Sequence, residues 1–201
     1  MIAALAALDP RIWQAVLAGA FVAAGWIVTN WQTRREAAKL RAERTRDVHR
    51  ALYAEIGATL TNLDSAGALD AHRDAVLTRL AEDPDFVPFV PREHGATVFD
   101  SIVAEIHVLP RVTIDPIVAY YSLLSAIASL VEDMRGDRFH SLPAERRAAV
   151  FADYIEMKKQ ALSFGQHATR VIALYAEGGK AAAEAGRLNS SGGAPSGRSP
   201  E

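Results

Sequence analysis

A run of about 20 residues without a charged side chain limits what this chain can fold into more than any other feature. It extends from Ile12 to Trp31 and reads IWQAVLAGAFVAAGWIVTNW. As an α-helix it would be about 30 Å long, which matches the hydrocarbon core of a bilayer. A helix that is apolar on every side needs lipid or a large protein around it, and 201 residues form only a small protein. The sequence therefore predicts a transmembrane helix over residues 12–31.

Tryptophans mark both ends of this run, as they do at membrane interfaces. Trp13 lies near one end, and Trp26 and Trp31 lie near the other. A cleaved signal peptide fits less well, because the start MIAALAALDP has no basic residue and the apolar run continues beyond Ala18-Gly19-Ala20. We therefore expect a retained anchor, preceded by a short extracytoplasmic segment, residues 1–11.

Basic residues are concentrated after the run and predict its orientation. One basic residue, Arg11, precedes the run. Four follow it closely: Arg34, Arg35, Lys39 and Arg41. The positive-inside rule then places the amino terminus outside and the body in the cytoplasm, at a bacterial inner (plasma) membrane. The same four charges would lie near anionic headgroups, although setting the topology is enough to explain them. A reversed topology, with a periplasmic envelope factor as the body, is the alternative.

Small residues form one stripe of the predicted span. Ala15, Gly19 and Ala23 recur every four residues, a spacing that lets two helices approach closely. Alanine-rich spans also produce this pattern by chance. The expected partners are the lipid bilayer and either another protein or a second copy of the chain. The net charge of -2 and pI of about 6.3 argue against nucleic acid.

The remaining chain predicts an all-α body. We expect residues 32–50 to form a charged helical stalk and residues 51–177 to form a small antiparallel helical bundle, with a helix break at Gly67. Within the bundle, Pro88 and Pro91 prevent regular helix, so residues 84–91 should be an extended strap whose valines and phenylalanines pack onto the body. Residues 178–201 should be a disordered tail.

Two apolar patterns define the main helices of the body. A buried stripe with helical spacing follows Pro116 and includes Ile117, Tyr120 and Ile127. From Ser141 to about Glu177 a heptad seam passes through Phe164, which predicts packing against an antiparallel neighbour or a coiled coil.

Motifs that carry known chemistry are missing from the sequence. There is no cysteine, and no two of the six histidines have the spacing of four residues that helical metal ligands need. Neither a nucleotide-binding loop nor a serine nucleophile elbow occurs. We therefore predict no catalytic, cofactor-binding or metal-binding residue. If the chain is instead an enzyme with a dispersed active site, His94, His107 and Tyr120 are the first residues to test.

The segment Val98 to Ile127, VFDSIVAEIHVLPRVTIDPIVAYYSLLSAI, has a short apolar helix, a Leu-Pro pair and a helix with two adjacent tyrosines. It resembles a pattern of uncharacterised bacterial single-pass membrane proteins, which carries no known activity. Together with the residue patterns, this favours a non-enzymatic, membrane-anchored helical interaction module: a scaffold, adaptor or regulatory subunit.

Overall fold

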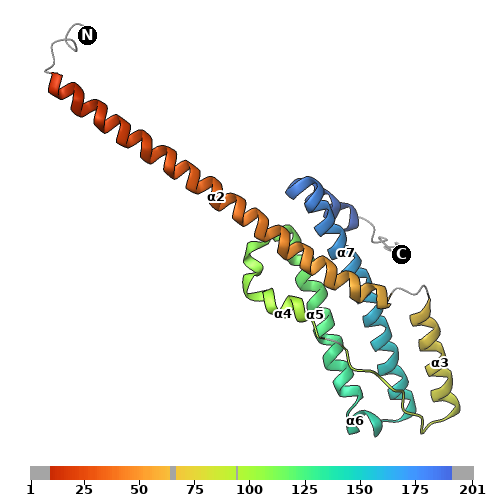
Figure 1. The fold of residues 1–201 in the computed structure, drawn as a ribbon. Coiled ribbons are helices and arrows are strands. Elements are labelled where there is room, and N and C mark those ends of the chain that lie inside the picture. The colour runs from red at the N-terminus through yellow and green to blue at the C-terminus, as the bar shows by residue number, and fades with distance from the viewer. Residues whose placement is uncertain (1–9, 64–66, 94, 192–201) are drawn as a thin grey trace, which may run out of the picture. The chain divides into compact units, whose positions relative to one another are not determined.

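The computed structural model describes residues 10–63, 67–93 and 95–191, and every regular element in these ranges is a helix (Figure 1). This confirms the all-α class for the described part of the chain. The chain divides into two compact units, Met1–Thr45 and Arg46–Glu201. Each is described by itself.

The first unit consists, where it is described, of the amino-terminal part of helix α2, Pro10–Leu63. Alanine-rich sequence without proline after Pro10 favours a long uninterrupted helix. Its three threonine hydroxyls bond back to the helix: Thr29 Oγ1 donates to the Gly25 carbonyl, Thr33 Oγ1 to the Thr29 carbonyl and Thr45 Oγ1 to the Arg41 carbonyl, all at 2.9 Å. These polar groups therefore need no partner outside the helix.

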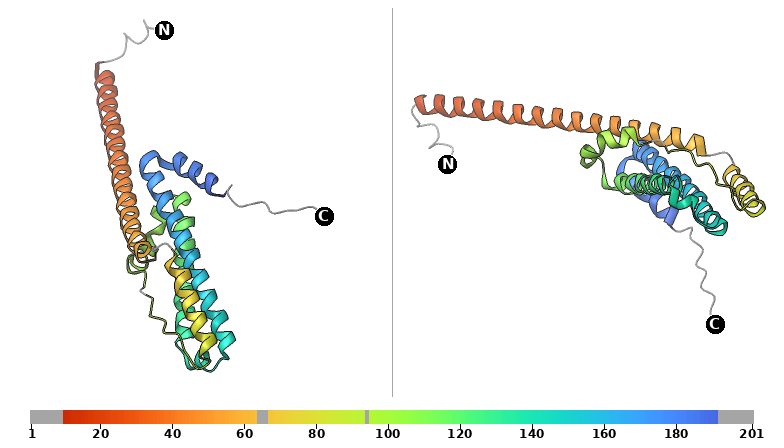
Figure 2. Two further views of the ribbon diagram at one scale, coloured as in Figure 1. Left: turned by 90° about the vertical axis from the view of Figure 1, so that its right-hand side faces the viewer. Right: turned by 90° about the horizontal axis from the view of Figure 1, so that it is seen from below.

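Helices α5, Arg111–Met134, and α7, Ala144–Ser191, pack against each other along the second unit (Figures 1 and 2). They run antiparallel, since Val112 lies in one core cluster with Val171 while Tyr120 lies against Gly165. Gly165 permits the close approach, because a Cβ there would be 2.9 Å from the Tyr120 ring and 2.6 Å from Leu60. The short α6, Asp137–His140, lies in the connection between them.

The last part of α2 and helix α3, Ala68–Glu82, complete the core of the second unit. Leu52 and Ile56 of α2 are fully buried in one cluster with Ile117 and Tyr120. A second cluster forms around Ile127, Val131, Met134, Phe151 and Ile155, against which Leu69 and Val76 of α3 pack. Between α2 and α3, Gly67 has a φ of +77°, which agrees with the predicted helix break.

The segment after α3 crosses the body without regular structure before α4, Thr97–Ile102, and the 3-10 helix η1, Val103–Val108. Pro88 and Val90 are buried, and Arg135 Nη1 donates to the Val90 carbonyl at 2.9 Å. The expectation that both phenylalanines of this strap pack onto the body is wrong for Phe89, which is 82% exposed. In an extended chain alternate side chains point in opposite directions, so Phe89 points away when its two neighbours point inward.

The carboxyl-terminal part of α7 differs from the expectation of disorder from residue 178. The structure has helix as far as Ser191, interrupted at Gly179, whose φ of 68° and ψ of -157° are not helical. Beyond this break, Ala183 is fully buried beside Val112 and Val171. The small residues of KAAAEAG allow this close packing, which the low-complexity appearance of the tail conceals. The last ten residues of the predicted tail, 192–201, lie outside the described part.

Candidate functional site

Large apolar side chains are exposed along the first part of α2. They lie at intervals of one to four residues, so they point in all directions around the helix. Their exposed fractions range from 43% for Trp13 to 77% for Phe21. The set comprises Trp13, Leu17, Phe21, Val22, Trp26, Ile27, Val28 and Trp31. An exposed apolar surface of this extent is typical of a segment that contacts lipid or another protein.

The basic residues that follow are also exposed. Arg34, Arg35, Lys39 and Arg41 all lie on α2, directly after the apolar part. The Arg35 guanidinium lies 3.6 Å from the centroid of the Trp31 ring, a cation–π contact. Arg41 Nε donates to the Ala37 carbonyl at 3.1 Å. Aromatic rings and cations are therefore adjacent at this end of the apolar part.

The predicted association stripe is only partly described. A Cβ added to Gly19 would meet no atom within 4 Å, and Ala23 is exposed. The side chain of Ala15 lies outside the described residues. Self-association through this stripe stays a prediction.

One helix of the described part, α5, has the length and apolar composition needed to cross a membrane. Nine of its residues, however, are buried in the body, among them Ile117, Tyr120 and Ile127. Its exposed face carries Ser122, Ser125 and Ser129. This combination of an apolar and a polar face is typical of a helix that packs one side against a folded core.

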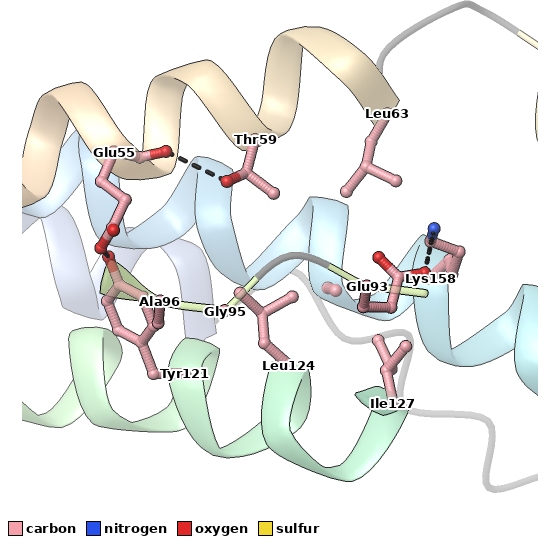
Figure 3. A pocket seen from close by; sticks show the side chains of 11 residues that line it. Glu55, Thr59, Leu63, Glu93, Gly95, Ala96, Tyr121, Leu124, Ile127 and Lys158 are labelled. Carbon is pink, nitrogen blue, oxygen red and sulfur yellow. Dashed lines mark hydrogen bonds and ion pairs between the residues drawn. The ribbon is translucent and has the colours of Figure 1, made fainter. Parts of the chain in front are cut away.

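The second unit contains a cavity of about 220 Å³ (Figure 3). Its walls come from α2, the segment between the strap and α4, α5 and α7, and they combine apolar side chains with three charged ones. The lining residues are Glu55, Thr59, Leu63, Glu93, Gly95, Ala96, Tyr121, Leu124, Ile127, Lys158 and Ala161.

Glu55 forms the first polar feature of this cavity and caps a helix from another part of the chain. Its carboxylate accepts hydrogen bonds from the amides of Val98, at 2.7 Å, and Phe99, at 3.0 Å. These are the second and third residues of α4, whose own N-cap position, Ala96, supplies no side-chain bond. Glu55 thus performs the task that a local Ser or Asp usually performs.

Tyr121 supplies a third hydrogen bond to the Glu55 carboxylate. Its hydroxyl donates to Oε2 at 2.7 Å, and its ring stacks on Phe99 with centroids 4.0 Å apart. Burial raises the pKa of Tyr121, and the hydrogen bond and negative charge of Glu55 raise it further. The phenol therefore stays protonated and acts as a permanent donor to the carboxylate.

Glu93, two residues after the strap, forms the second polar feature. Its Oε1 accepts from Lys158 Nζ at 2.7 Å and from the Tyr154 hydroxyl at 2.9 Å. Burial raises the pKa of Tyr154, and the charge of Glu93 adds to this effect. This carboxylate is therefore neutralised by a lysine of α7, and the bond holds the segment after the strap to that helix.

The residues chosen for a dispersed active site do not line this cavity. Tyr120 is fully buried in the core, where burial raises its pKa, and His107 is exposed on η1. His94 lies outside the described residues. Within the residues that the structure describes, no three His, Cys, Asp or Glu side chains form a group able to hold a metal ion.

The sequence patterns do not reveal the cavity residues Glu55, Glu93 and Lys158. One signal is present: Glu55 directly precedes Ile56 of the apolar stripe through Leu52, Ile56 and Leu60, so it lies at the edge of a buried face. Comparison of the chain with models of protein families, with curated proteins and with solved structures finds no match.

Proposed function

We propose that this chain is a membrane-anchored helical interaction module at the cytoplasmic face of the bacterial inner membrane. Residues 12–31 would cross the membrane once, with the amino terminus outside. The observation that carries the proposal is the exposure of eight large apolar side chains on all sides of α2. Each such side chain gains about 1.5–3 kcal/mol on leaving water, so lipid around this segment would stabilise it by more than about 10 kcal/mol.

The flanking residues support the same placement. The tryptophans Trp13, Trp26 and Trp31 suit the interfaces, and the Trp31–Arg35 contact lies where the headgroup region would begin. Arg34, Lys39 and Arg41 would then lie on the cytoplasmic side, facing anionic lipid.

The body supports a role in binding another protein as a scaffold, adaptor or regulatory subunit. Phe89 is exposed on a strap that is fixed on both sides, since Arg147 donates to the Pro84 carbonyl and Arg135 to the Val90 carbonyl. A rigidly presented aromatic side chain is the usual centre of a protein–protein contact.

Paired arginine substitutions test which segment crosses the membrane. Phe21→Arg combined with Val22→Arg should release the full-length chain from membranes washed with alkaline carbonate, because each central arginine costs about 2.5–3.5 kcal/mol in insertion. The matched control is Val118→Arg combined with Ser122→Arg on the exposed face of α5. The control should stay in the membrane fraction. Release by the α5 pair, with retention by the α2 pair, would refute the proposed span.

The same cells can report orientation, because the chain has no cysteine of its own. A single cysteine in place of the exposed Gln160 should react with a membrane-impermeant maleimide only after spheroplasts are lysed. One at position 4 should react before lysis. Labelling of the Gln160→Cys variant in intact spheroplasts would establish the reversed, periplasmic topology instead.

A further inference from the structure

The cavity of the second unit combines an apolar floor with polar groups at separate places on its wall. Leu124 and Ile127 of α5, together with Leu63 and Ala161, supply the apolar part. Figure 3 shows Glu55 and Thr59 at one side of Leu124, and Glu93 with Lys158 at the other. A molecule inside would meet hydrocarbon along its length and hydrogen-bonding groups at its ends.

The size of the cavity fits a small organic molecule. An apolar protein cavity of about 150 Å³ holds benzene, with six heavy atoms. The volume of about 220 Å³ therefore accommodates a molecule of about nine heavy atoms. Because charged groups line this cavity, an occupant must match their charge as well as fill the space.

The charges of the lining do not balance. Lys158 and Glu93 neutralise each other at 2.7 Å. Glu55 accepts only from two amides and one phenol, all of which are uncharged donors, and no lysine or arginine of the described part forms an ion pair with it among the salt bridges found. Among the residues that the structure describes, the cavity therefore carries one negative charge that no cation pairs, on a carboxylate that is already fixed in place.

Hydrogen-bond capacity remains beside this charge. A carboxylate has about four acceptor sites, of which Glu55 uses three within the chain. Thr59 donates its proton to the Glu55 carbonyl at 3.1 Å, which leaves lone pairs of its hydroxyl oxygen to accept. An ammonium group has three donors and no acceptor, so it matches this surplus of acceptors.

We propose that the cavity binds a small amphipathic cation: a primary alkylammonium of about five to nine heavy atoms. Its ammonium group bonds to Glu55 and Thr59, and its hydrocarbon part packs on Leu124 and Ile127. The inference does not depend on the membrane anchor, because every lining residue belongs to the second unit.

Titration of n-pentylammonium into the full-length chain in lipid nanodiscs tests this, with isoleucine and leucine methyl resonances as the readout. The methyl groups of Ile127, Leu124 and Leu63 should shift in a saturable manner. The neutral n-pentanol and the anionic pentanoate have the same chain and should bind at least tenfold more weakly. Equal binding of all three, or shifts confined to residues outside the cavity, would overturn the proposal.

Glu55→Gln removes the charge and keeps the shape, and its one amide oxygen can still accept from the Phe99 amide and the Tyr121 hydroxyl, whereas the bond from the Val98 amide is lost. It should weaken n-pentylammonium binding at least tenfold. Glu132→Gln removes an equal charge from an exposed ion pair with Arg92 and should change it less than twofold. An equal loss in both variants would reduce the effect to general electrostatics and contradict the proposed site. If Glu55→Gln proves unfolded by its methyl spectrum, the comparison of the three ligands on the unaltered chain decides alone.

Discussion

A buried histidine joins three helices of the body. His49 of α2 lies with Nε2 2.9 Å from Thr113 Oγ1 of α5, and its ring packs against Tyr175 of α7 at a centroid distance of 5.2 Å. Because the Thr113 hydroxyl donates to the Pro110 carbonyl, the proton of this pair must be on His49 Nε2. Of the two neutral tautomers of His49, the fold therefore selects the one with its proton on Nε2.

Acid should therefore destabilise the body through this residue. Burial lowers the pKa of His49 to about 4 from its ordinary 6.5. Between these values the unfolded chain binds a proton that the folded chain does not, so this contribution is complete above pH 6.5 and is lost as the pH falls toward 4. The free energy of unfolding should fall by up to about 3 kcal/mol over this interval. Urea unfolding at a series of pH values measures it.

Two substitutions separate this effect from other titrations. His49→Gln keeps an N–H that can reach Thr113 but cannot be protonated, so its stability should vary less with pH between 6.5 and 4. His107→Gln, at an exposed histidine, should keep the slope of the unaltered chain. A slope that survives His49→Gln would assign the acid sensitivity elsewhere.

Helix α7 is interrupted at Gly179. Gly179 has a positive φ combined with an extended ψ, a backbone conformation that is essentially restricted to glycine. The helical residues after it pack with Ala183 against Val112 and Val171, and Gly186 lies against Leu174. The break is what lets the end of α7 contact the body.

Alanine substitutions at two glycines should have opposite effects. Gly179→Ala should destabilise the chain by about 1–3 kcal/mol and raise the hydrogen exchange of amides 180–186, because the packed conformation becomes strained. Gly57→Ala lies inside α2, where a Cβ meets nothing within 4 Å, and should stabilise by about 0.4–1 kcal/mol. Unchanged exchange in Gly179→Ala would mean that the segment after the break is not held by this conformation.

The helices could be predicted where the spacing of apolar residues within one helix is enough to show which of its sides is buried. The stripe Ile117, Tyr120 and Ile127 of α5 is buried as its spacing indicates. The predicted seam of α7 consists of Val150, Tyr154, Met157, Ala161, Phe164, Ala168, Val171 and Tyr175. It is less accurate, because Phe164 is only half-buried, whereas Phe151 and Ile155, which are not part of the seam, are buried. A heptad seam describes one neighbour, but α7 packs on both α5 and α3, which widens its buried face.

The cavity was beyond prediction for a different reason. Glu55 and the amides that it caps are separated by more than 40 residues, and Glu93 and Lys158 by more than 60. No local pattern records such pairings, because each carboxylate looks like an ordinary surface residue in its own helix or loop. The prolines of the strap predict its extended conformation, but they do not predict where it lies on the body, which depends on tertiary contacts.

We expect the second unit, Arg46–Glu201, to fold without the first. The buried residues found in the described chain all lie at or after Val48. A chain shortened to Arg46–Glu201 should therefore remain in the soluble fraction and unfold cooperatively, within a few degrees of the full-length chain in detergent. Sedimentation with membranes that resists carbonate would show that the body itself binds lipid and would contradict this independence.

The buried face of α2 also has a consequence for synthesis. Leu52 and Ile56 leave the ribosome early, but Ala168 and Ile172 of α7, in the same core cluster, follow about 115 residues later. At about 5–20 residues per second, this leaves the two side chains without their final neighbours for roughly 6–23 s. During that interval the nascent chain exposes the apolar stripe that contains Leu52 and Ile56. We therefore expect a chaperone that binds apolar segments to bind the nascent chain rather than the folded protein.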